Sequence, residues 1–307
     1  MKVFGSFAEA GSSLRGWAAC LGNFDGVHLG HQALFAAARA LGQVAALTFQ
    51  PHPGKVLQPQ LAPRLIATHG RKLELLESVG VEATLVQPFS LEYARTTPEA
   101  FEAGLFDQLQ LAAVVVGSDF TYGQKRAGTV ERLTEAAARR KAKVVAVPAV
   151  TVEGVVVSSS KIREYVLEGR VEAATRFLGR PFDLEGVVVP GAGRGRTIGF
   201  PTANIDTANE LRPAAGVYAV RVRVVGEGGR AFGGAANIGV KPTFGGGEVT
   251  IEAHLFDYQG DLYGKRLRVE FLERLRPEKR FASASELSAQ IARDLEAARN
   301  AVARSST

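Results

Sequence analysis

The sequence lacks the features that mark secreted and membrane proteins. It contains a single cysteine, Cys20, and therefore cannot form an internal disulfide. No apolar run approaches the roughly 20 residues that span a bilayer, and the first residues lack the apolar core and cleavage site of a secretory signal. These absences predict a cytoplasmic protein with no membrane partner. Because Cys20 lies in an apolar stretch, we expect a buried small side chain rather than a reactive thiol.

Long blocks of one charge are also missing. The 37 basic and 31 acidic residues leave a net charge of +6, and the basic residues are scattered along the chain. The densest basic run, 139–143, ends a predicted helix, where cations complement the helix dipole. The charge therefore fits anionic small substrates as well as nucleic acid and selects neither.

The apolar content is sufficient for about two domains, with 46% hydrophobic residues in a chain of 307. Residues 18–180 alternate short apolar runs with amphipathic segments, a pattern typical of a parallel, doubly wound sheet covered by helices. The predicted strands of this half are 44–49, 84–86, 113–116 and 143–147. Ligands of such sheets lie beyond the carboxyl ends of the strands, where the polar motifs of this half also stand.

From residue 184 onward the pattern changes to closely spaced strands with frequent glycine, which predicts a small antiparallel β-barrel. The strands are expected at 186–189, 216–222, 249–255 and 267–271, and an amphipathic helix over 285–299 closes the chain. We therefore predict an α/β protein with a Rossmann-like domain over 1–181 and a barrel domain with a terminal helix over 182–307.

The most informative run, 21–31, joins a predicted strand to a predicted helix through a Gly-rich turn. Glycines let the backbone pass close to a ligand, and the amides of a helix start face negative charge. His28 and His31 stand three residues apart on one face of that helix start. This arrangement predicts a site for a nucleoside triphosphate, because imidazoles can bind phosphate oxygens during displacement at phosphorus.

Two other interpretations of these histidines stay open. A lone histidine in such a turn more often caps the helix or lies in the core. A zinc site is weaker, because neither a cysteine nor a further ligand stands at a familiar spacing.

The first strand of the second half leads into a loop rich in glycine and arginine. Its amides and guanidinium groups suit a polyphosphate, whereas its glycines alone would predict only a flexible hairpin. Thr202 and Asn204 occupy alternate positions of an extended segment, so their neutral oxygens share one face. Such oxygens suit a hard cation such as Mg²⁺.

Residues 28–31 resemble the HxGH signature of the nucleotidyltransferase superfamily, and residues 157–163 resemble its second signature. Together with the runs 48–53, 116–123 and 200–204, these motifs make almost the whole chain similar to the bacterial bifunctional riboflavin kinase/FAD synthetase family. The family usually carries an acidic residue, an arginine and a threonine where this chain has Gln50, Thr121 and Ser160.

The resemblance implies that the first half is an FMN adenylyltransferase, in which the FMN phosphate attacks the α-phosphorus of ATP and pyrophosphate leaves. No covalent enzyme intermediate is implied. The resemblance gives stabilisation of the pentacoordinate phosphate to His28 and His31, with Arg163 as a further catalytic residue. It assigns nucleotide or pyrophosphate binding to Gly22, Asn23, Phe24, Asp25, Gly26, Ser159 and Ser160, and positioning of the flavin or the nucleotide to Asp119.

For the second half, the resemblance implies a riboflavin kinase with Glu252 as the base that activates the ribityl hydroxyl. Thr202 and Asn204 are then expected to hold Mg²⁺, and Asn237 and Arg276 to border the flavin. The nucleotide is assigned to Gly193, Arg194, Gly195 and Arg196. ATP, riboflavin, FMN and FAD are the expected substrates and products.

Two alternatives come from other functional classes. The barrel could bind nucleic acid beside an adenylyltransferase, but it lacks the interleaved aromatic residues of a stacking platform, so no nucleic-acid partner is expected. The chain could also be an idle flavin sensor, against which the intact motifs of both halves argue. The sequence does not predict an oligomeric state.

Overall fold

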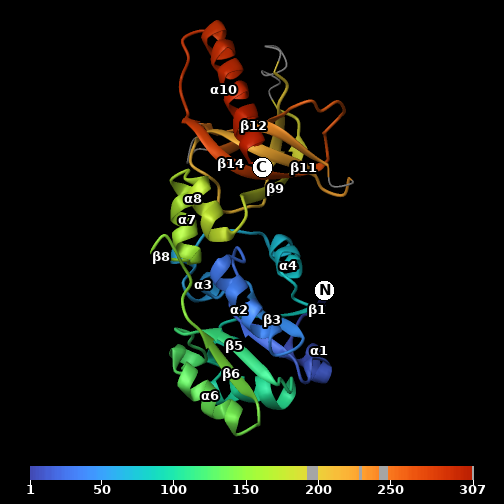
Figure 1. Cartoon of the computed structure of the whole chain (residues 1–307), viewed down its shortest axis with the longest axis vertical. Helices are drawn as coiled ribbons and strands as arrows, with labels where there is room; N and C mark the ends of the chain where they lie inside the picture. The colour runs from blue at the N-terminus through green and yellow to red at the C-terminus, as the bar shows by residue number, and fades with distance from the viewer. Residues whose placement is uncertain (192–199, 228–229, 242–247, 306–307) are drawn as a thin grey trace. The chain divides into compact units, whose positions relative to one another are not determined.

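The computed structural model of the chain describes residues 1–191, 200–227, 230–241 and 248–305 (Figure 1). These residues form two compact units. The first consists of 1–64 and 69–158, and the second of 65–68 and 159–307.

The first unit is built on a parallel sheet of six strands in the order β1-β4-β3-β2-β5-β6. The strands are β1 Lys2–Phe4, β2 Ala18–Leu21, β3 Val44–Gln50, β4 Ala83–Pro88, β5 Ala113–Gly117 and β6 Lys143–Val147. Every residue of β2 is buried, as expected of a strand covered on both faces.

Six helices and a small hairpin complete this unit. The helices are α1 Phe7–Ala10, α2 Leu29–Arg39, α3 Pro53–Leu57, α4 His69–Ser78, α5 Pro98–Ala103 and α6 Val130–Ala138, and the hairpin strands are β7 Thr151–Val152 and β8 Val155–Val156. Helix α2 packs against β2 and β5, and α6 packs against β6 (Figure 1). Short 3-10 or π turns lie at 11–14, 59–61, 93–95, 104–108 and 124–126.

The second unit is a closed antiparallel barrel with strand order β10-β13-β12-β11-β14-β9. Its strands are β9 Phe182–Val189, β10 Ala203–Asp206, β11 Gly216–Val224, β12 Ala231–Lys241, β13 Glu248–Leu255 and β14 Arg266–Pro277. The helices are α7 Ser159–Leu167, α8 Val171–Leu178 and α10 Ala284–Arg304. Helix α8 packs on β9 and β14, whereas α10 packs on β11, β12 and β14.

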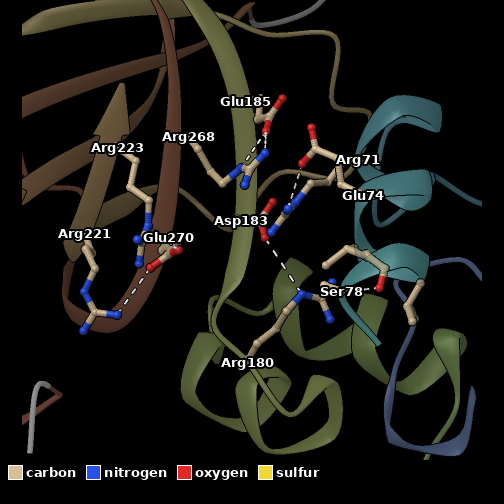
Figure 2. Close-up of polar contacts among 12 residues, drawn as sticks. Arg71, Glu74, Ser78, Arg180, Asp183, Glu185, Arg221, Arg223, Arg268 and Glu270 are labelled. Carbon is tan, nitrogen blue, oxygen red and sulfur yellow. Dashed lines mark hydrogen bonds and ion pairs between the residues drawn. The ribbon is translucent and has the colours of Figure 1, made fainter. Parts of the chain in front are cut away.

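Ion pairs join neighbouring strands of the barrel (Figure 2). Arg268 of β14 pairs with Glu185 of β9, and its Nε donates to Oε1 at 2.6 Å. Arg221 and Arg223 of β11 both pair with Glu270 of β14. These pairs fix the register on the outer face of the barrel, whose inner face holds apolar side chains such as Phe271.

This architecture confirms the predicted fold class, a doubly wound parallel sheet followed by a small barrel with a terminal helix. The domain boundary predicted at 181/182 does not coincide with the division between the compact units and stays a prediction. The chain packs as compact units that divide at 158/159, and α7 and α8 belong to the unit that contains the barrel.

Candidate active sites

The first candidate site lies where β2 ends and α2 begins. The intervening loop contains two non-glycine residues with left-handed backbone, Phe24 at φ 51° and Val27 at φ 42°. Such conformations cost about 1 kcal/mol or more each and persist where surrounding contacts hold them. Phe24 is fully buried, and its ring packs on Phe35 and His31 with centroids 5.0 and 5.2 Å away. The apolar anchor therefore keeps the loop in one shape.

The two histidines of the loop lie against each other. His28 is the N-cap of α2 and is 6% exposed, and its ring stacks on that of His31 with centroids 3.6 Å apart and planes 17° apart. The His31 backbone N–H donates to His28 Nδ1 at 3.4 Å, which places the proton of a neutral His28 ring on Nε2. The helix-cap interpretation of His28 is therefore confirmed, and the functional role of the pair stays a prediction.

Burial sets the charge of His31. Desolvation, followed by the nearby His28 and Lys72, lowers the pKa of His31 well below 6.5, so the ring is neutral at pH 7. Its Nδ1 is buried and makes no hydrogen bond within the described structure.

Asp119 follows β5, the strand that pairs with β2. The chain passes from β2 to β3 and β4 on one side and continues with β5 and β6 on the other, so β2 and β5 flank the switch point of the sheet. Ligands of doubly wound sheets bind at this place. The loops that hold His28 and Asp119 therefore leave the same edge of the sheet from adjacent strands.

Two further groups near this loop were absent from the sequence analysis. Lys72 of α4 is 8% exposed, and its Nζ donates to Thr48 Oγ1 at 3.2 Å and to the Asn23 carbonyl at 3.4 Å. His69 opens the same helix with a buried Nδ1 that has no hydrogen-bond partner within the described structure. In sequence both belong to an ordinary amphipathic helix, so no local signal marks them.

Ser159, Ser160 and Arg163 lie together in the first turns of α7, which begins at Ser159. A helix start presents free amide N–H groups and suits phosphate. These residues belong to the compact unit that contains the barrel, whereas His28 and His31 belong to the other unit.

The second candidate site lies on the barrel, where three predicted residues occupy one line across three strands. Glu252 of β13 pairs in register with Asn204 of β10 on one side and Asn237 of β12 on the other. Residues directly opposite in adjacent strands project from the same face. Thr202, just before β10, donates from Oγ1 to Glu252 Oε2 at 3.4 Å. The strand order thus brings together residues that are 50 positions apart in sequence.

Close packing surrounds this line. A Cβ on Gly191 would lie 2.0 Å from the Asn204 amide nitrogen, so a larger residue there would displace the Asn204 side chain. His254, two residues after Glu252, makes a 2.8 Å hydrogen bond through Nδ1 with the Pro201 carbonyl. That bond holds the segment before Thr202 against β13, which gives His254 a structural role.

A pocket of about 150 Å³ opens beside Thr202. Its walls include Pro201 and Thr202 from the segment before β10, and Tyr258 and Tyr263 from the turn after β13. The sequence analysis did not name that turn, because its residues, DYQGDLY, are those of an ordinary polar loop.

The remaining residues predicted for the second half fall into two sets. Gly193, Arg194, Gly195 and Arg196 lie outside the described residues. Arg276 of β14 pairs with Asp294 of α10: its Nε donates to both carboxylate oxygens at 3.0 Å and its Nη2 to Oδ2 at 2.8 Å. In the structure this guanidinium therefore docks the terminal helix.

Among the residues that the structure describes, no three His, Cys, Asp or Glu side chains gather as a metal site. None of the helices in that part of the chain is long and apolar enough to cross a membrane.

Comparison with known proteins matches each half to a separate family. Residues 11–161 match the FAD synthetase family model, and residues 178–302 match the riboflavin kinase family model.

Relatives and solved structures extend this likeness to the whole chain. Bifunctional riboflavin kinase/FMN adenylyltransferases from Bacillus subtilis and Haemophilus influenzae are 38% and 34% identical over 89% and 97% of this chain, which span 89% and 98% of those proteins. A crystal structure described as a macrolide-efflux protein from Streptococcus pneumoniae superposes with a TM-score of 0.88 at 33% identity, over 97% of this chain and 98% of that one.

Proposed function

This chain belongs to the family of bifunctional riboflavin kinases/FMN adenylyltransferases, and we infer from that membership how its two halves share two successive reactions. The second half phosphorylates riboflavin with ATP to FMN, and the first half adenylylates FMN with ATP to FAD and pyrophosphate. The observation that carries this conclusion is the match of two different family models to the parallel-sheet half and the barrel half of the chain. The roles of individual residues given below are our proposal.

In the first half, the His28 and His31 rings donate hydrogen bonds to oxygens of the α-phosphoryl group as negative charge builds on them. The stacked geometry supports this, because both rings share one side of the loop at the start of α2. The FMN phosphate attacks phosphorus directly, and the loop Gly22–Gly26 lies against the nucleotide. Asp119, which leaves the adjacent strand, positions the flavin or the nucleotide.

Ser159, Ser160 and Arg163 bind the departing pyrophosphate. Their place in the first turns of α7 supports this role, because hydroxyls, the amide N–H groups of a helix start and a guanidinium all suit phosphate oxygens. The proton balance needs no base here, since the attacking FMN phosphate is already ionised at pH 7.

In the second half, Glu252 accepts the proton of the ribityl 5′-hydroxyl as that oxygen attacks the γ-phosphorus of ATP, and ADP leaves. Its register position between Asn204 and Asn237 supports this role, since both neighbours supply neutral polar groups beside the carboxylate. Asn237 borders the flavin, and the Gly- and Arg-rich loop of residues 193–196 borders the nucleotide.

Thr202 and Asn204 would hold Mg²⁺, which when bound neutralises the charge of the ATP phosphates. The residues fit this ion: a hydroxyl and an amide oxygen are hard donors, and Mg²⁺ in kinases takes its remaining ligands from phosphates and water. The Thr202 hydroxyl already lies within 3.4 Å of the Glu252 carboxylate.

We also propose a cytoplasmic protein whose partners are the small molecules ATP, riboflavin and FMN, with no nucleic-acid or membrane partner. Both reactions consume ATP, and the net charge of +6 favours the approach of the anions ATP and FMN.

The test incubates purified protein with riboflavin, ATP and Mg²⁺ and separates the flavins by chromatography. We expect FMN first and then FAD. Glu252→Ala should lower FMN formation by about 100-fold or more while FAD synthesis from supplied FMN continues, because only the kinase base is lost. His28→Ala should do the reverse by a similar factor.

Either variant, if folded and inactive in both reactions, would contradict the assignment of one active site to each half. Turnover of riboflavin to FAD by the unaltered protein excludes the idle sensor. A salt-dependent gel shift would support nucleic-acid binding by the barrel instead.

A further inference from the structure

One buried cation of the first unit has no part in the reactions described above. Lys72 lies on α4 with 8% of its surface exposed, on the side of the helix that faces β3 and the loop after β2. A buried ammonium is costly unless it is paired and hydrogen-bonded, so its surroundings indicate what it does.

The contacts of Lys72 converge on a single backbone atom. Its Nζ reaches the Asn23 carbonyl at 3.4 Å and Thr48 Oγ1 at 3.2 Å, and the Thr48 hydroxyl itself donates to the same Asn23 carbonyl at 3.1 Å. Three elements therefore meet at Asn23: α4, the end of β3 and the loop after β2. Asn23 directly precedes the left-handed Phe24.

The charged and titratable neighbours of Lys72 are few. Asp25, 5% exposed in the same loop, is close enough for its charge to favour the ammonium, while His31 of α2 and His69 of α4 are close enough for Lys72 to disfavour their protonation. The ammonium thus stands among one carboxylate and two imidazoles, both of which have a buried Nδ1 without a partner in the described structure.

We propose that Lys72 is a positioning residue of the adenylyltransferase site, whose ammonium holds the loop Gly22–Gly26 in the shape that receives the nucleotide. The inference rests on the proposed function of the first half. It adds a residue from α4 to those that the loops after β2 and β5 supply.

Burial lowers the pKa of Lys72 to about 8, with the Asp25 charge opposing the shift. The ammonium is therefore lost as the pH rises from 7 to 9, and the positioning should weaken over this interval. FAD synthesis should decline on the alkaline side near pH 8, whereas an arginine at this position stays charged throughout.

The experiment uses the full-length chain with Lys72→Met, Lys72→Arg and Thr48→Val. Lys143→Met is the matched control, because Lys143 is an exposed lysine on the edge strand β6 of the same unit. Steady-state kcat and KM for ATP are measured for FAD synthesis from FMN between pH 6 and 9.5. FMN formation from riboflavin by the same preparation reports whether the other half is intact.

We expect Lys72→Met to lower kcat/KM for FAD synthesis about tenfold or more, because a small displacement of a binding loop is costly. The alkaline decline near pH 8 should vanish in Lys72→Met and move to higher pH in Lys72→Arg. Thr48→Val should lower kcat/KM for FAD synthesis less than Lys72→Met does. Lys143→Met should have the kcat/KM of the unaltered chain.

FAD synthesis by Lys72→Met within twofold of the unaltered chain, or an unaltered alkaline decline in that variant, would overturn the proposal. If Lys72→Met fails to fold, the pH profile of Lys72→Arg decides instead. An alkaline decline of FAD synthesis that moves to higher pH supports the proposal, and one that stays near pH 8 overturns it. An unaltered chain that makes no FAD from FMN would instead contradict the proposed function of the first half.

Discussion

His31 illustrates how the surroundings of one side chain determine its chemistry. An exposed histidine is partly charged near neutral pH, whereas this ring is buried beside a second imidazole and a lysine, and its pKa falls well below 6.5. A neutral ring keeps one N–H that can donate a hydrogen bond to phosphate. The same burial makes the folded state sensitive to acid.

That sensitivity leads to a prediction. The unfolded chain takes up a proton at His31 below pH 6.5 and the folded chain does not, so the free energy of unfolding falls as the pH drops through 6.5, by up to about 1.4 kcal/mol per pH unit for this group. In His31→Asn, the loss of stability between pH 7 and 5.5 should be smaller. Urea unfolding followed by the fluorescence of Trp17, the only tryptophan of the chain, measures this in the first unit.

Lys143→Met is a suitable control for this experiment, because it removes an exposed charge from the same unit. Identical pH dependence in His31→Asn and the unaltered chain would contradict the neutral state of the buried ring.

At the scale of elements, the apolar patterns of the sequence predicted most of the strands and helices. They did not predict the contacts that tertiary packing creates between elements. The strands expected at 44–49, 113–116 and 143–147 are found with bounds within one residue, since continuous apolar runs mark buried parallel strands. The roles of Asn204, Glu252 and Asn237 could be expected only by resemblance, because the sequence of a single strand does not determine which strands are its neighbours in the barrel.

Lys72 and Arg276 make tertiary contacts that no sequence pattern predicts. An amphipathic pattern predicts that a helix buries one face, but it does not reveal that a lysine on that helix meets a carbonyl from another loop. Likewise, Asp294 stands in sequence as one acidic residue of a charged helix. Only the packing of α10 on the barrel makes it the partner of Arg276.

The pair Arg276–Asp294 yields a prediction at this scale. The two side chains are 20% and 9% exposed, so Asp294→Ala should leave a half-buried guanidinium unpaired and lower the free energy of unfolding of the second unit by about 2–4 kcal/mol. The double variant Arg276→Met, Asp294→Leu should recover most of that loss, because an apolar pair replaces the ion pair. Urea unfolding followed by far-UV circular dichroism gives both values.

The same double variant tests the flavin role of Arg276. If this side chain only docks α10, KM for riboflavin in the double variant stays within about threefold of the unaltered chain. A much larger rise in KM in a stable double variant would support contact with the flavin.

At the scale of the whole molecule, the chain combines two compact units, one built on a parallel sheet and one on an antiparallel barrel. The family matches end at 161 and resume at 178, so most of α7 and α8 lies between them. Helix α8 packs on β9 and β14, which accounts for its place in the unit of the barrel. The predicted boundary at 181/182 stays a prediction.

Two inactive variants of the whole chain should therefore complement each other. Glu252→Ala lacks the kinase and His28→Ala lacks the adenylyltransferase, so neither alone should convert riboflavin to FAD. Mixed in equal amounts with riboflavin, ATP and Mg²⁺, they should form FAD after a lag in which FMN accumulates. Chromatography over time measures both flavins, and FMN that builds up without any FAD would contradict independent sites.

Cys20 has a practical consequence of its own. It lies fully inside β2, where burial raises the pKa of its thiol, and the sequence holds no second sulfhydryl. A cysteine engineered at an exposed position would consequently react with maleimide dyes while the buried Cys20 stays unlabelled. Fluorophores or spin labels could then be attached at chosen points of the native chain, with no background mutation needed beforehand.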